Sequence, residues 1–161
     1  RLGKKPTVLF IAALGSLVYG GTWFLYTPAA PWLQVFASAG IAFTAAGYYM
    51  MDQTIGADIM DYDELQTGKR REGAFSACGS WMSKAGNAFG YFLSGQVLGL
   101  TGFAADKAVQ SPETIFWIRA MLAGIPIAGL VLVAFFMSRY PLTQEKMADI
   151  RAQLEARRGK V

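Results

Sequence analysis

Forty-six consecutive residues, 6–51, carry no charged side chain: PTVLFIAALGSLVYGGTWFLYTPAAPWLQVFASAGIAFTAAGYYMM. Two apolar segments, 7–26 and 32–52, account for nearly all of this stretch. Each has about 20 residues, the length with which a helix crosses ~30 Å of hydrocarbon. The link between them, TPAAP (27–31), holds two prolines and allows only a tight turn. The stretch therefore predicts a hairpin of two membrane-spanning helices.

Composition excludes several classes of protein. Among 161 residues, 53% are hydrophobic and 16% are charged, whereas about 25% charged residues is typical of soluble chains. The apolar content also excludes disorder. The sequence has no His and a single Cys, Cys78. A His-based catalytic triad, a His-ligated metal, an internal disulfide and a cysteine zinc cluster are therefore all excluded.

Two further spans follow, at 73–100 and 114–137. The third span is interrupted by one charge, Lys84, and the fourth has Arg119 near its start and Pro126 inside. Four spans of this length are too many and too long for a signal peptide. The sequence thus predicts an all-α polytopic membrane protein with four transmembrane helices.

The basic residues predict how these spans are oriented. Twelve of the 15 precede the first span, separate the second from the third, or follow the fourth. The positive-inside rule then places both ends of the chain, and the segment between the second and third spans, in the cytoplasm. The twelve are Arg1, Lys4, Lys5, Lys69, Arg70, Arg71, Arg139, Lys146, Arg151, Arg157, Arg158 and Lys160.

Residues 139–161 are expected to form a cytoplasmic amphipathic tail. Thr143 is a candidate N-cap, with Glu145 in the first turn where the helix dipole favours an anion. We expect the tail to lie on the membrane or on the underside of the protein itself. Its apolar side chains recur at helical spacing: Leu142, Met147, Ile150 and Leu154.

The third span carries a polar stripe that includes Ser80, Lys84 and Asn87, spaced by four and then three residues. Lys84 lies twelve residues past Glu72, roughly 18 Å along a helix. A cation near the bilayer centre costs at least ~2.5 kcal/mol, so it requires a hydrated cavity, a carboxylate partner, or both. The polar neighbours favour a hydrated path, and a purely structural ion pair is the alternative.

A second charged cluster follows the second span. Asp58 and Asp61 are three residues apart and share one helix face, and Arg70 and Glu72 come shortly after them. These charges form either a solvated loop or an ionic latch at the cytoplasmic end of a pathway. Acid–base catalysis is poorly supported, because no nucleophile or metal-ligand set accompanies the carboxylates. We therefore do not expect an enzyme.

Three motifs carry a family resemblance: ADIMDYDE at 57–64, GKRREG at 68–73 and SWMSKAG at 80–86. Together they resemble the helix-ten to helix-eleven signature of the glycoside–pentoside–hexuronide:cation symporters, the melibiose-permease branch of the major facilitator superfamily. The resemblance covers most of the chain. It implies that the four spans are helices 9–12 of a twelve-helix fold, and that the chain is a C-terminal fragment.

The resemblance also implies roles for particular residues. Lys84 is similar to the family's lysine near sugar and coupling cation, Ser80 to a hydroxyl near the sugar, and Tyr49 to an aromatic side chain that stacks on the sugar ring. Asn87 joins them as a candidate substrate-binding residue through the polar stripe. Asp63 departs from the family pattern, which leaves the sugar open. The residues that resemble the family's cytoplasmic gate are Asp58, Asp61, Glu64, Arg70 and Glu72.

The implied function is cation-coupled symport of a sugar or glycoside by alternating access, in a multi-pass protein of the cell (inner) membrane. The coupling cation, Na⁺ or H⁺, would be bound mainly by the N-terminal half, which this chain lacks. The expected partners are the sugar, the lipid bilayer and that N-terminal half. No nucleic acid, metal or cofactor is expected. A symporter of lysolipids or other amphiphiles, and a small structural four-helix membrane protein, stay open as alternatives.

Overall fold

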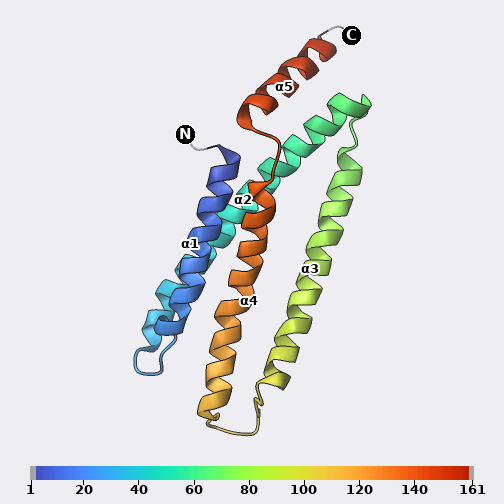
Figure 1. The fold of residues 1–161 in the computed structure, drawn as a ribbon. Coiled ribbons are helices and arrows are strands. Elements are labelled where there is room, and N and C mark those ends of the chain that lie inside the picture. Colours follow the sequence, from blue (N-terminus) through green and yellow to red (C-terminus); the bar gives the residue numbers. More distant parts are fainter. Residues whose placement is uncertain (1–2, 160–161) are drawn as a thin grey trace.

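The computed structural model describes residues 3–159, and this part of the chain is helical, with no strand (Figure 1). The prediction of an all-α fold is confirmed for these residues. Four long helices are followed by a shorter one, and a single 3-10 turn, η1 (Pro31–Leu33), precedes the second. The helices are α1 (Lys4–Leu25), α2 (Gln34–Thr67), α3 (Glu72–Leu100), α4 (Pro112–Ser138) and α5 (Gln144–Arg158).

Three of these helices follow the predicted spans closely, and α2 differs. It does not stop near residue 52 but continues as one helix to Thr67. The segment contains no proline, and its only glycine before the end is Gly56. Gly68 then ends the helix with a left-handed φ of 68°, and its N–H donates to the backbone O of Glu64 at 2.9 Å. A loop is thus confined to residues 68–71.

Helix α1 packs against both α2 and α4. Two of its four buried residues, Ala12 and Gly15, are small. A Cβ added at Gly15 would lie 2.9 Å from Cδ1 of Leu130 on α4. The glycine therefore sets how closely these two helices approach, as small residues do between membrane helices.

Two helices, α1 and α4, are long and apolar enough to cross a membrane by length and composition. Proline begins α4, where Ser111 caps it by accepting a hydrogen bond from the N–H of Thr114 at 3.1 Å. The helix passes through Pro126 without a break. Near its start, Arg119 donates to the backbone O of Tyr26, which ties α4 to the end of α1.

Helix α3 stands apart from the other helices. It meets α2 at the short turn and diverges from it along its length (Figure 1), and none of its 29 residues is buried. Only Phe75, Leu93 and Val97 are even partly covered. The consequence is an open space between α2 and α3.

Helix α5 begins at the predicted N-cap, since Thr143 Oγ1 accepts from the N–H of Lys146 at 3.3 Å. The tail lies on the part of α2 that continues beyond residue 52, so it covers the protein itself. Tyr62, Leu65 and Tyr140 pack against its buried apolar side chains. Those buried side chains are the predicted set: Leu142, Met147, Ile150 and Leu154.

Candidate functional site

A cavity of about 810 Å³ occupies the space between α2 and α3. Tyr49 lines it from α2, and Ser80, Lys84 and Asn87 line it from α3. The structure thus places all four candidate substrate-binding residues on the walls of one cavity. Three of them come from α3, and Tyr49 comes from α2. The stripe spacing on α3 explains this, because residues four and three apart share a helix face.

The walls of this cavity are chemically mixed. Hydroxyl groups from Ser76, Ser80 and Ser83, and the amides of Gln53 and Asn87, lie among apolar side chains. Lys84 adds an ammonium group and makes no ion pair within 4.0 Å among the described residues. Such walls offer hydrogen bonds to a polar solute and an aromatic ring for stacking, as ligand pockets commonly do.

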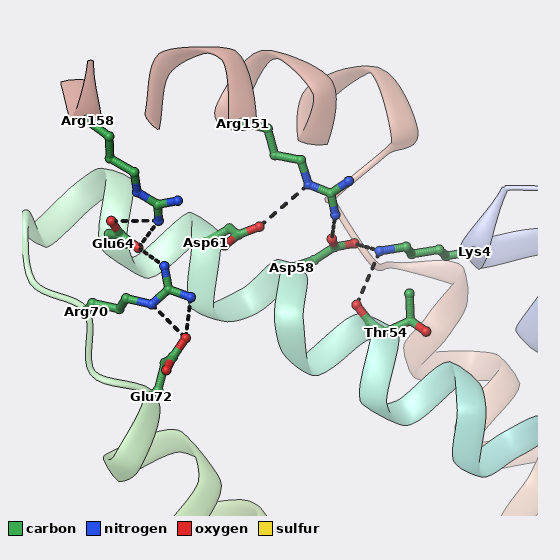
Figure 2. A network of polar contacts seen from close by, with 9 residues as sticks. All are labelled: Lys4, Thr54, Asp58, Asp61, Glu64, Arg70, Glu72, Arg151 and Arg158. Carbon is green, nitrogen blue, oxygen red and sulfur yellow. Dashed lines mark hydrogen bonds and ion pairs between the residues drawn. The ribbon is translucent and has the colours of Figure 1, made fainter. Parts of the chain in front are cut away.

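Asp58 lies at the centre of a separate ion-pair network (Figure 2). Its side chain is fully buried, with 0% exposure. Lys4 of α1 donates to one carboxylate oxygen, Oδ2, and Arg151 Nη2 of α5 donates to the other, Oδ1, at 3.0 Å. Lys4 Nζ also donates to the backbone O of Thr54 at 3.2 Å. A buried carboxylate requires such pairing, and here it joins three helices.

The other candidate gate residues lie in this network or in a second group of ion pairs beside it. Arg158 donates to Glu64 at 2.9 Å, and Arg70 lies 3.6 Å from the same carboxylate. Arg70 Nε also donates to Glu72 Oε1 at 2.6 Å, across the start of α3. Asp61 lies 3.6 Å from Nε of Arg151. The five predicted residues therefore fall into two neighbouring groups of ion pairs (Figure 2). Asp58 and Asp61 pair with cations of α1 and α5. Glu64 and Glu72 share Arg70, and Glu64 also pairs with Arg158 of α5.

Sequence reasoning missed three cations of these ion pairs: Lys4, Arg151 and Arg158. Their positions in the sequence predict only the orientation of the chain. The spacing of the two arginines, seven residues, is two helical turns, which predicts that both lie on one face of α5. Lys4 gave no such signal, because its partner Asp58 is 54 residues away in the sequence.

Neighbouring charges shift the pKa of several groups near the turn between α2 and α3. A hydrogen bond from Arg71 lowers the pKa of Asp63, and that same contact raises the pKa of Arg71. The carboxylate of Glu72 raises the pKa of Arg70. The carboxyl of Asp63 is thus ionised in the folded state at any pH above the ordinary pKa of an aspartate. Its stabilising effect is lost only as the pH falls through the lowered pKa.

Tyr140 lies beside the network with its hydroxyl buried and without a hydrogen-bond partner among the described residues. Burial raises the pKa of this phenol, and the negative charge of Asp58 raises it further. The phenol therefore stays neutral at physiological pH. No group of three His, Cys, Asp or Glu side chains within residues 3–159 is arranged to hold a metal ion.

Long apolar helices beside a cavity that holds an unpaired cation are typical of helical membrane transporters. Residues 1–144 match the family described as MFS/sugar transport protein. The chain belongs to this family, as the resemblance of its motifs implied.

Curated relatives of this chain are transporters. It is 36% identical over 165 residues to an uncharacterized symporter of Synechocystis sp., covering 89% of this chain and 28% of that protein. It is 33% identical to the glucuronide carrier protein homolog of Escherichia coli, covering 98% of this chain and 34% of that protein. The isoprimeverose transporter of Lactiplantibacillus pentosus is 29% identical, covering 93% of this chain and 32% of that protein.

The chain therefore spans about a third of the length of the curated relatives it matches. No solved structure matches the chain.

Proposed function

We propose that this chain forms part of a secondary active transporter that imports a sugar or glycoside together with a coupling cation, Na⁺ or H⁺. The family and the printed names of the relatives, among them a glucuronide carrier homolog and an isoprimeverose transporter, support this proposal. Family membership also favours transport over the structural four-helix alternative.

One observation carries the proposal: Tyr49, Ser80, Lys84 and Asn87 line the same cavity. A sugar presents hydroxyl groups on its edge and C–H bonds on its faces. Hydroxyl, amide and ammonium groups can hydrogen-bond to the hydroxyl groups on the edge, and an aromatic ring can stack on the face. In this proposal Lys84 contacts the substrate and couples it to the cation by exchanging carboxylate partners.

The proposal includes a topology in which α1, the first part of α2, α3 and α4 span the inner membrane. Both ends of the chain and the turn between α2 and α3 lie in the cytoplasm. Because the chain spans about a third of its relatives, the remaining cavity wall would come from other parts of the transporter, the N-terminal half above all. That half would also supply most ligands of the coupling cation.

In this scheme the two groups of ion pairs close the cytoplasmic end of the pathway. Alternating access requires that contacts at one end form in one state and break in the other. The pairs of Asp61 and Glu64 suit this role, because their arginine partners are about half exposed. Pairs between partly exposed groups are weak enough to exchange.

The first test uses Lys84→Ala in the full-length transporter, assayed in membrane vesicles that carry an imposed Na⁺ or proton gradient. We expect gradient-dependent accumulation of the sugar to fall at least about tenfold, since a hydrogen bond to a charged group contributes roughly 1.5–3 kcal/mol. Lys107→Ala is the matched control, because Lys107 is an exposed cation in the loop between α3 and α4.

Normal accumulation by Lys84→Ala at normal expression would show that this lysine has no coupling role. The same vesicles are tested with lysolipids. Accumulation of a lysolipid in place of every sugar offered would favour the amphiphile alternative over the sugar transporter.

A further inference from the structure

Asp52 is a second charged residue in the cavity between α2 and α3. Of the side chains that line this cavity, only Asp52 and Lys84 are charged. They come from opposite walls, Asp52 from α2 and Lys84 from α3. The part of the cavity that this chain builds therefore carries one negative and one positive charge.

The two charges lie at similar distances from the short turn between α2 and α3. Asp52 precedes the end of α2 at Thr67 by 15 residues, about 22 Å of helix. Lys84 follows the start of α3 at Glu72 by 12 residues, about 18 Å. Both charges therefore lie at a similar distance along their helices from the short turn, and both line the same cavity.

Asp52 takes no part in the cytoplasmic network. Asp58, six residues further along α2, is fully buried and paired with two cations. Asp52 is exposed and lies within 4.0 Å of no cation among the described residues. In the proposed topology Asp52 ends the second span, and a carboxylate there without a structural partner points to a function.

Asp52 lines more than one cavity. It also lines a cavity of about 430 Å³ against α1 and α4, and a third of about 290 Å³ near the cytoplasmic end of α4. Asp52 thus lines all three of these cavities.

We propose that Asp52 determines the charge preference of the substrate: its carboxylate balances Lys84, favours neutral glycosides and opposes anionic ones such as hexuronides. This inference rests on the proposed function. The charges of a cavity act on the charge of its ligand over the whole space they enclose. A uronide that approaches Lys84 is repelled by the Asp52 carboxylate in the same cavity, whereas a neutral sugar is not repelled.

The test measures binding of matched sugars to the purified full-length transporter by titration calorimetry. Phenyl β-D-glucoside is paired with phenyl β-D-glucuronide, and phenyl β-D-galactoside with phenyl β-D-galacturonide. Each pair differs only at C6, a hydroxymethyl group against a carboxylate. The wild-type protein should prefer the neutral member of a pair.

Asp52→Asn should shift the ratio of the two Kd values at least about tenfold toward the anionic sugar, because one repulsive charge across a protein cavity has an effect on this order. Asp52→Glu retains the charge and should keep the wild-type ratio. Asp106→Asn removes an exposed carboxylate from the loop between α3 and α4, and it should change nothing. Asp52→Ser replaces Asp52→Asn if the latter does not fold.

An unchanged ratio in the neutral variants, with sugar binding intact in the wild-type protein, would overturn the role of Asp52 alone. If the wild-type protein bound neither member of either pair and accumulated no sugar, the proposed function would fail and this inference with it. The two failures are therefore distinguishable.

Discussion

At the residue scale, Asp58 and Asp61 show how burial separates two similar carboxylates. Asp58 is fully buried between Lys4 and Arg151, whereas Asp61 is 26% exposed and has one cation at 3.6 Å. From the sequence, both are predicted to lie on one helix face and to belong to the same cytoplasmic gate, because residues three apart share a face. The sequence could not show that one of them holds three helices together.

This difference gives a paired prediction for the full-length protein. Asp58→Asn leaves two cations without their carboxylate and should destabilise the protein by about 1–3 kcal/mol, below the full cost of a broken buried pair because both cations are partly exposed. Asp61→Asn should keep the melting temperature and slow net transport more than it weakens equilibrium binding of substrate.

The measurements are thermal unfolding in detergent, transport in vesicles and substrate binding at equilibrium. Equal loss of binding and transport in Asp61→Asn would place Asp61 in the binding site or the fold. A melting temperature unaffected by Asp58→Asn would show that Asp58 does not hold the helices together.

At the element scale, most helices could be predicted from apolar length alone. The span predicted at 73–100 and helix α3 differ by one residue at the start, because charges and a glycine-containing turn bound it sharply. The continuation of α2 to Thr67 could not be predicted in this way, since its last turns are polar. They are helical because Tyr62 and Leu65 pack on α5, a contact between distant parts of the sequence.

The contact of α1 with α4 gives the prediction at this scale. Gly15→Val should destabilise the full-length protein by about 1–3 kcal/mol, because the added methyl groups meet Leu130 and force the helices apart. Gly20→Val on the same helix is the control, since a Cβ there meets nothing within 4 Å among the described residues. Thermal unfolding compares them, and an equal loss in both variants would contradict the close approach at Gly15.

At the scale of the whole molecule, the candidate cavity could be anticipated only in part. The stripe of Ser80, Lys84 and Asn87 followed from helical spacing, and Tyr49 was added by the family resemblance. The sequence pattern identifies Asp52 only as the last residue of a span. Its place opposite Lys84 depends on how α2 and α3 are arranged, which periodicity along one helix does not contain.

The proposed topology gives the prediction at this scale. In a full-length Cys78→Ser background without other accessible thiols, Asp106→Cys should react with a membrane-impermeant maleimide in intact cells. Lys69→Cys, in the turn between α2 and α3, should react only after the cells are permeabilised, because the positive-inside rule places that turn in the cytoplasm. The reverse labelling pattern would invert the orientation.

The long sequence separation between α5 and its ion-pair partners on α2 has a consequence for synthesis. Arg151 follows Asp58 by 93 residues, and Arg158 follows Glu64 by 94. While the ribosome makes the intervening helices, Asp58 lacks Arg151 and Glu64 lacks Arg158, and these contacts form only when α5 has been translated. Chains that terminate before α5 retain an undercompensated Asp58 and an uncovered apolar surface on α2. Proteolytic quality control of the membrane can therefore discriminate such truncated chains from completed ones.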